Sequence, residues 1–585
     1  MTQDEIKKEM QRRADWHKPQ THVIADYYRI RRKVAYPLPL REMTLLDMPV
    51  SGLDTYPWSI WVLWDLEERV NSLGWAATWF GDSDAASLVR TDLEALTAWP
   101  CYRQYERPDL SLGHCARMLW LAYHNWDWLG ETPRAKIEDA FGRIIADATP
   151  YSDALHGQFV SKEDILALDE PHSVLHNIPL IGTVGIALAA HAIGHAIGHE
   201  LAPVLDRRLH AIMGAILDLR ASGHSEGVGY DGYIMDFVVH WLYAMPEEDR
   251  KPVIEHPRFG DLLDESVALG APGDVANVAE IGDVEPKEMP YHLAAHAKLW
   301  PMTKDKRAAW LLAKCRIDWM RADALGVLHD VVDGWDVETP DVGGQDAHYA
   351  TVLRSGWDAE SLAVVMSASN SPMGHLQKDS GTLLVGSRGR WLIDDPGYQQ
   401  YIKKTEREFT LGATAHNTPV INGHAQVEKL SERNVAIDTL GDGLYRMAVD
   451  LTACYDASLG LDLVKRSVWL KDDGLLVVGD QISGAHIDRV NYYWHGHPDA
   501  AWWVADNWAQ IYFPDVTLWV SSPQTELKNE LVDRLPGSRG QLTLCAETDK
   551  TASIHWWVFA IGDAAPDVTV GDLCMDVNGD SFLIS

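Results

Sequence analysis

The spacing of apolar residues changes once along this chain of 585 residues, and that change constrains the fold most. Between about residues 45 and 320, apolar side chains recur at helical spacing. After the polar segment GWDVETPDVGGQ, at residues 334 to 345, short alternating runs are typical of strands. The clearest helical segments are 58–79, 112–129, 180–200, 201–223 and 235–245, and the clearest strand segments are 351–357, 361–369, 382–394, 462–482, 489–496, 510–522 and 552–562.

A block of helices followed by a block of strands indicates segregated domains rather than alternating βαβ units. A chain of this length also exceeds what one hydrophobic core supports. We therefore predict an α+β multidomain protein with an N-terminal (α/α) toroid of paired helices over residues 1–335. An antiparallel β-sandwich over residues 346–585 should follow it.

Charge and cysteine content limit the partners and the compartment. The formal net charge of -34 repels nucleic acid and anionic lipid, so we expect neither as a partner. The six cysteines show no CxxC spacing, which favours reduced thiols. The first residues, MTQDEIKKEMQRRADWHKPQ, lack the apolar core of a signal peptide, and the apolar run 178–190 is shorter than the roughly 20 residues of a membrane helix. We expect a cytoplasmic protein, or a periplasmic one if a leader has been removed.

Two polar motifs interrupt the helical half. His176 and Asn177 precede a Gly/Ala-rich apolar helix, and the segment GHSEGVGYDGY carries Tyr230 and Tyr233 just before another helix. Taken alone, Asn177 fits a helix cap, His176 a loop residue and Tyr230 an aromatic anchor. The histidines of GIALAAHAIGHAIGHE, spaced four apart on one expected helix, favour a polar stripe over a metal site.

The strand half begins with its own polar motif. The stretch GHLQKDSGTLLVGSRGRWLIDDPGY carries His375, and AHNTPVINGHAQ follows from Ala415. Turns between these strands leave imidazoles and carboxylates at strand ends, where packing alone rarely needs them. This arrangement indicates a functional site.

In their order along the chain, these pieces resemble the heparinase II/III-like polysaccharide lyases, a family that includes alginate lyases. The resemblance implies an enzyme that cleaves a uronic-acid-containing acidic glycan by β-elimination and forms a 4,5-unsaturated product. It implies that Asn177, with His176, neutralises the substrate carboxylate. Tyr230, in the E-G-x-x-Y segment, would take the C5 proton or protonate O4, with Tyr233 in reserve.

From the β-domain, the resemblance implies that His375, the first His of an H-x-H-x-D motif, assists from across the domain interface. Tyr398 and Tyr401 are further candidates for an acid. Relatives that contain metal hold a structural zinc through the second His of this motif, an Asp and a later His. Here Gln377 replaces that His, whereas the two other ligands match Asp395 and His416, so we expect a weakened or absent zinc site and no cofactor for the chemistry.

Two other functions remain open. A glycoside hydrolase on a helical toroid would use paired carboxylates, for which Glu226, Asp231 and Asp236 are the candidates. A non-catalytic glycan-binding protein would need only aromatic walls, such as the tryptophans of WSIWVLW. The expected partner is an acidic polysaccharide or oligosaccharide, and we leave a homodimer open.

Overall fold

The computed structural model describes residues 1–27, 32–41, 59–103, 108–194, 196–284, 291–397, 408–532, 541–549 and 553–584. The chain divides into two compact units. The first comprises Met1–Ala221, Val228–Leu262 and Lys287–Glu338, and the second comprises Ser222–Gly227, Leu263–Pro286 and Thr339–Ser585. Two segments of the expected helical domain therefore pack with the strand half, which the expected boundaries of 1–335 and 346–585 did not include.

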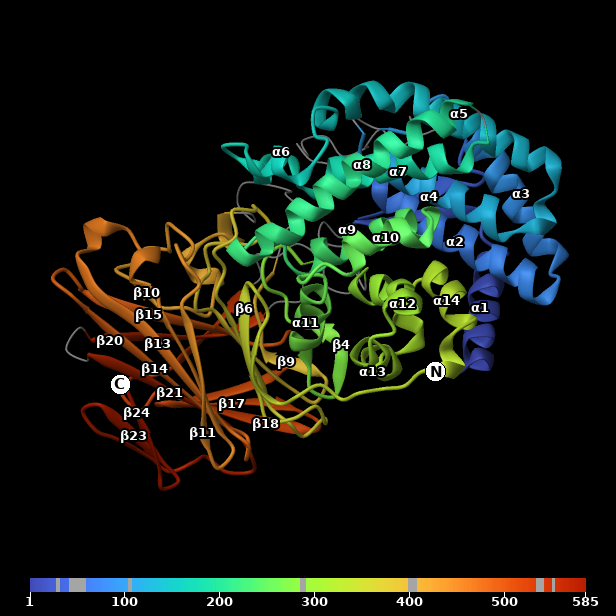
Figure 1. The fold of residues 1–585 in the computed structure, drawn as a ribbon. Coiled ribbons are helices and arrows are strands. Elements are labelled where there is room, and N and C mark those ends of the chain that lie inside the picture. Colours follow the sequence, from blue (N-terminus) through green and yellow to red (C-terminus); the bar gives the residue numbers. More distant parts are fainter. Residues whose placement is uncertain are drawn as a thin grey trace. The chain divides into compact units, whose positions relative to one another are not determined.

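The first unit is built on a closed ring of helices (Figure 1). Each ring helix contacts the next, and the last contacts the first: α2 (Ser59–Phe80), α4 (Leu110–Asn125), α7 (Asn177–Ala192), α9 (Val228–Ala244), α12 (Tyr291–Thr303) and α14 (Ala322–His329). Helices that pack against this ring are α1 (Gln3–His17), α3 (Ser83–Thr97), α5 (Glu131–His156), α8 (Ala196–Leu219) and α13 (Lys306–Lys314). The predicted toroid is confirmed.

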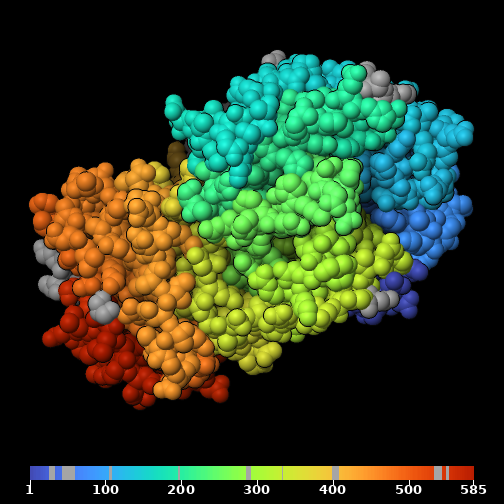
Figure 2. Space-filling model, viewed as in Figure 1, coloured from blue at the N-terminus to red at the C-terminus, as the bar shows by residue number. Residues whose placement is uncertain are grey.

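Smaller elements complete this unit. Helices α6 (Lys162–Leu166) and α10 (Glu247–Ile254) contact α8, and Figure 2 shows the side chains of α6 and α8 next to each other at the surface. The hairpin of β1 (His22–Tyr27) and β2 (Arg32–Pro37) contacts α2. Short 3-10 turns are η3 (Asp127–Leu129), η4 (Pro171–Val174), η5 (Arg220–Ser222), η6 (Ile317–Trp319) and η7 (Val332–Gly334).

Helix α7 lies at the centre of this packing because it is apolar on nearly every face. Two glycines allow it to approach α4 closely. A Cβ on Gly185 would lie 3.1 Å from Cα of Gly113, and a Cβ on Gly113 would lie 2.4 Å from Cγ2 of Ile181. Larger residues at these positions would push the two helices apart.

The histidines at 191 and 199 do not share a helix, contrary to our expectation. Helix α7 ends at Ala192 because Ile193 adopts an extended backbone, and α8 starts at Ala196. His191 bonds through Nε2 to Oδ1 of Asp206 at 2.9 Å. The residue between them, His195, lies outside the described residues. The prediction of a regular polar stripe of histidines along one helix is therefore wrong.

The second unit is made of antiparallel sheets, as predicted. A five-stranded sheet has the order β5-β6-β7-β8-β9, an eight-stranded sheet the order β11-β12-β13-β14-β21-β18-β17-β16, and a four-stranded sheet the order β10-β15-β20-β19. Their strands are β5 (Gly343–Asp346), β6 (Ala350–Arg354), β7 (Ala363–Ser367), β8 (Leu383–Ser387), β9 (Arg390–Ile393), β10 (Val420–Ile421), β11 (Val435–Gly441), β12 (Leu444–Asp450), β13 (Leu461–Lys471), β14 (Leu475–Gly484), β15 (Arg489–His495), β16 (Ala501–Ala505), β17 (Trp508–Phe513), β18 (Val516–Ser521), β19 (Lys528–Val532), β20 (Gln541–Asp549) and β21 (Ile554–Ile561).

One apolar core joins the inner faces of these sheets, as in a β-sandwich. It contains Leu353 and Val364 from the five-stranded sheet, Val468 and Phe559 from the eight-stranded sheet, and Trp494 from the four-stranded sheet. A small sheet of β22 (Val568–Val570), β23 (Cys574–Val577) and β24 (Asp580–Leu583) packs on a second cluster. Short 3-10 turns here are η8 (Ala413–Ala415), η9 (Thr452–Cys454) and η10 (Ala457–Leu459).

The segment Leu263–Pro286 joins this unit through its backbone. Most of α11 (Asp261–Ala268) and the hairpin of β3 (Gly270–Ala271) and β4 (Asp274–Val278) belong to it. Arg354 on β6 donates to the carbonyl oxygens of Ala268 at 2.6 Å and Gly270 at 3.0 Å. Across the described part of the chain, no helix has both the length and the apolar character to span a bilayer.

Candidate active site

His375 lies between two carboxylates in the second unit. Its Nδ1 is 3.2 Å from Oδ2 of Asp283, and its Nε2 is 3.3 Å from Oε2 of Glu226. The amide of Gln377 donates to the other oxygen of Asp283 at 3.0 Å. We call Glu226, Asp283, His375 and Gln377 the His375 cluster. Both carboxylate side chains are fully buried, whereas the imidazole is 20% exposed, so the ring is the accessible member beside them.

The backbone around His375 is fixed by further hydrogen bonds. The amide of Asp283 donates to the carbonyl oxygen of His375 at 2.8 Å. Gly282, with φ +81°, permits this approach, because a Cβ there would lie 2.5 Å from that carbonyl oxygen. Ser371 donates from Oγ to the carbonyl oxygen of Ser225, next to Glu226, at 2.6 Å. Segments 222–227, 281–284 and 371–377 are thus tied together.

Lys429 anchors the same loop from the other side. Its Nζ donates to the carbonyl oxygens of Ser371 at 2.7 Å and Met373 at 2.6 Å. Burial lowers the pKa of Lys429 to about 8, although the charges of Asp379 and Asp283 act in the opposite direction. This lysine therefore holds the main chain just before His375.

In the first unit, the two candidate tyrosines have different surroundings. Tyr230 lies in the first turn of α9 and is half-buried. Tyr233, one turn later, is only 1% exposed, and its OH lies 2.7 Å from Nε2 of His114. Its ring also stacks on Tyr291 with the ring centroids 4.5 Å apart. Tyr230 is accordingly the more exposed of the two tyrosines, and Tyr233 is a core residue.

His114 shows why Tyr233 is held so firmly. The Nε1 of Trp64, which can only donate, points at the same Nε2 of His114 at 3.0 Å, so this nitrogen accepts. Its Nδ1 then donates to Oε2 of Glu67 at 2.9 Å. Burial lowers the pKa of His114 to about 4, against the charge of Glu67, so the ring is neutral near pH 7. Arg117 bonds twice to Glu67 and pairs with Asp236.

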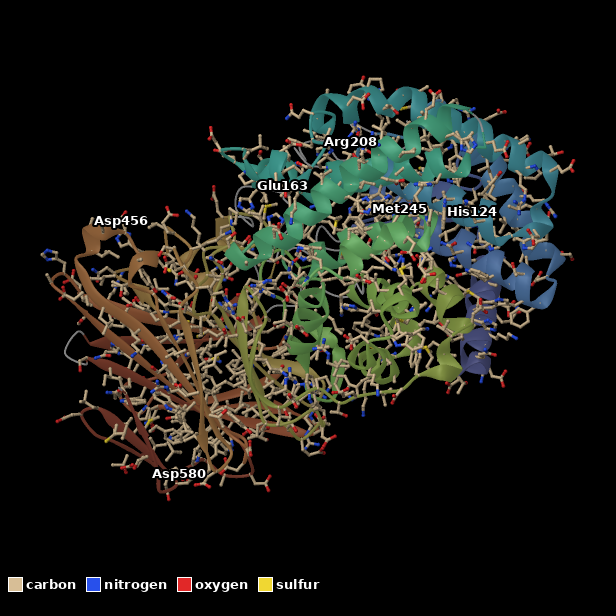
Figure 3. All side chains as sticks on the ribbon, in the orientation of Figure 1. His124, Glu163, Arg208, Met245, Asp456 and Asp580 are labelled. Carbon is tan, nitrogen blue, oxygen red and sulfur yellow. The ribbon has the colours of Figure 1, made fainter. Side chains whose placement is uncertain are left out.

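Asn177 and His176 stand at the start of α7. His176 occupies the N-cap position and is half-buried, whereas Asn177 is the first helical residue and is 2% exposed. The N-cap residue is therefore His176, one residue before the Asn177 that the sequence suggested. A polar chain contacts the second turn of α7: Arg208 of α8, labelled in Figure 3, donates to Oγ of Ser152 at 2.7 Å, and this Oγ lies 3.3 Å from Oγ1 of Thr183.

Asp395 and His416 meet, as the sequence suggested for a metal pair. Nδ1 of His416 lies 2.9 Å from Oδ2 of Asp395, and both side chains are buried. Burial lowers the pKa of His416, but the charge of Asp395, the hydrogen bond to it, the charge of Asp379 and a hydrogen bond to the backbone of Thr410 together outweigh burial, so the net shift is upward. Within the described residues, no third His, Cys, Asp or Glu joins them in a metal-binding group, and Gln377 bonds to Asp283 instead. These two residues form a hydrogen-bonded pair and do not by themselves fit zinc.

Tyr398 and Tyr401 lie outside the described residues. Of the hydrolase candidates, Asp231 pairs with Arg220 at 3.0 Å, Asp236 pairs with Arg117 and Lys298, and Glu226 faces His375. Each carboxylate thus has a basic partner, which is not the arrangement of a carboxylate pair left to act on a glycosidic bond.

Asp283 is the member of the His375 cluster that sequence reasoning missed. It stands 92 residues before His375, in a stretch with no motif of its own. The one signal in the sequence was the glycine before it. Glycine is favoured where the backbone needs a positive φ or passes close to another segment, and Gly282 does have a positive φ. Glu226 was noticed as a motif residue, but its pairing with His375 was not predicted.

The comparisons agree with this architecture. Residues 337–569 match the family model described as heparinase II/III-like, C-terminal. No curated protein matches the chain. The solved structure of heparinase III resembles it over 92% of this chain and 84% of its own, at 13% identity and a TM-score of 0.60. A mutant of the heparan sulfate lyase HepC from Pedobacter heparinus covers 100% of this chain and 94% of its own, at 15% identity and a TM-score of 0.56. The resemblance seen in the sequence is confirmed: the C-terminal domain belongs to the heparinase II/III-like family, and the whole chain has the heparinase III fold.

Proposed function

We propose that this protein is a polysaccharide lyase that cleaves an acidic glycan containing uronic acid by β-elimination. The observation that carries the proposal is that the likeness to heparinase III covers 92% of the chain, so it includes both units and not only the matched C-terminal domain. The solved structures that resemble it over nearly their whole length include a heparan sulfate lyase. An acidic glycosaminoglycan is therefore the first substrate class to test.

The reaction removes the proton on C5 and expels the glycosidic oxygen on C4. It needs a group that neutralises the carboxylate, a base for the C5 proton and an acid for O4. Asn177, with His176, is the proposed partner of the carboxylate, because an amide and an imidazole donate hydrogen bonds to it. Tyr230 is the proposed base and acid.

His375 is the proposed histidine of the reaction. Its imidazole is accessible while its flanking carboxylates are buried, so it presents a donor or acceptor whose orientation is already set. The proposed roles of these residues do not require a metal. We propose that the Asp395–His416 pair supports the strand ends around Asn417. The amide of Asn417 donates to the carbonyl oxygens of Leu383 at 2.8 Å and Asp394 at 2.7 Å.

An ultraviolet assay tests this function on heparan sulfate, chondroitin sulfate, hyaluronan and alginate, with a neutral glucan as control. A lyase creates a C4=C5 double bond, which absorbs, so absorbance should rise with at least one acidic glycan and not with the glucan. New reducing ends without absorbance would instead identify a glycoside hydrolase. Binding without either product would identify a glycan-binding protein.

A further inference from the structure

The His375 cluster is asymmetric, and this asymmetry assigns separate tasks to its members. Asp283 is held at three points: its backbone amide donates to the carbonyl oxygen of His375, Gln377 donates to Oδ1, and Oδ2 faces Nδ1 of the ring. Glu226, on the Nε2 side, is held near the ring through the bond between Ser371 and the backbone of Ser225. The Nδ1 side of the imidazole is therefore tied to a carboxylate whose two oxygens are both engaged.

We infer that Asp283, oriented by Gln377, is the positioning residue that fixes His375 through Nδ1, so that Nε2 is the nitrogen that acts on the substrate. Glu226 is the partner of Nε2 in the free protein. The action of Nε2 on a substrate rests on the proposed function. The orientation of the His375 ring by Asp283 does not.

The physical basis is the restriction of ring rotation. A carboxylate oxygen only accepts hydrogen bonds, so a ring nitrogen bonded to Asp283 must carry a proton. The bond to Asp283 fixes the proton and the orientation of Nδ1, so Nε2 is the nitrogen that a substrate would meet in place of Glu226. Gln377 matters because an unrestrained carboxylate could rotate and release Nδ1. Carboxylates that orient a metal-binding histidine change activity by roughly 10- to 100-fold when they are removed, and we expect a loss of the same order for Asp283.

Enzyme kinetics test the assignment through Asp283→Asn and Gln377→Met, with Asp438→Asn as a control. Asp438 is a partly exposed carboxylate of the same unit, paired with Arg446. Both cluster variants should lose about 10- to 100-fold in kcat with little change in KM, while the control keeps wild-type turnover. In a His375→Ala background the same two changes should have no further effect. An equal loss in that background would show a general structural role and overturn the inference, as would wild-type kcat in Asp283→Asn.

A second measurement does not depend on activity. Nitrogen-15 spectra of the histidine rings in the full-length protein report which nitrogen of His375 carries a proton and how it is bonded. Asp283→Asn should shift the Nδ1 resonance of His375, and Gln377→Met should broaden or shift it, whereas Asp438→Asn should leave it in place. An unchanged His375 resonance in a folded Asp283→Asn protein overturns the inference. If wild-type protein yields no unsaturated product but these shifts occur, the proposed function fails and the positioning of His375 stands.

Discussion

Asp283 and His375 stand 92 residues apart in the sequence, yet Oδ2 of Asp283 lies 3.2 Å from Nδ1 of His375. The contact exists because a segment between two helices of the first unit packs with the strands of the second unit. Glu226 arrives in the same way, through Ser222–Gly227. The surroundings of a histidine in the strand half are thus completed by residues from the helical half of the sequence.

The first prediction separates the two tyrosines of α9. Tyr230→Phe should keep the fold and lower kcat by about 10²- to 10⁴-fold, the usual contribution of a general acid or base. Tyr233→Phe should keep most turnover but lower the free energy of unfolding by about 1 kcal/mol, because it removes a buried hydrogen bond to His114. Steady-state kinetics and thermal melts of both variants provide the check. Loss of turnover in Tyr233→Phe alone would move the catalytic role to that residue.

The second prediction concerns the stability of the fold at acidic pH. Burial lowers the pKa of His114, His240 and His296 to about 4, below the value of about 6.5 for an unfolded histidine. The unfolded chain therefore binds more protons between these values. The stability from these neutral rings is complete above about pH 6.5 and is lost as the pH falls toward 4.

Melting temperatures at pH values from 7.5 down to 4 should accordingly decrease. His296→Gln removes one of these titrating groups, so its melting temperature should depend less steeply on pH than that of the wild type. Parallel curves for the two proteins would contradict the assignment of this pH dependence to buried histidines.

Much of the fold follows from local pattern, and particular residues show why. The apolar run after Asn177 predicted a buried helix, since such a run has no other place than a core, and α7 confirms it. The segments 382–394 and 462–482 were predicted to be strands, and in the structure each forms a hairpin that turns at Arg388-Gly389 or at Gly474. These elements depend on neighbours close in sequence.

The candidate site depends on distant neighbours and was therefore predicted only in part. His375 and Tyr230 were found from motifs, whereas Asp283 gained its role through a contact that no local pattern encodes. The break of the helix at Ile193 was missed as well. Apolar spacing continues through that point, and only the extended backbone at Ile193 ends α7.

The third prediction concerns metal. Protein purified without added metal should contain well under one equivalent of zinc, because His416 and Asp395 bond to each other and Gln377 bonds to Asp283. A chelator should leave kcat unchanged. Elemental analysis and activity before and after chelation give the answer, and a full zinc equivalent lost in a His416→Gln variant would show that this pair does bind metal.

The last prediction tests the backbone beneath the His375 cluster. Gly282 adopts φ +81°, and a Cβ there would lie 2.5 Å from the carbonyl oxygen of His375, so Gly282→Ala must displace one of the two segments. Such strain costs on the order of 1–3 kcal/mol and should move His375 away from Asp283. We expect a lower melting temperature and a kcat reduced at least as much as in Asp283→Asn. Gly142→Ala is the matched control, because a Cβ at Gly142, within α5, meets no atom within 4 Å and alanine favours a helix. Equal kcat for the two variants would mean that the backbone bond between Asp283 and His375 does not set the position of the ring.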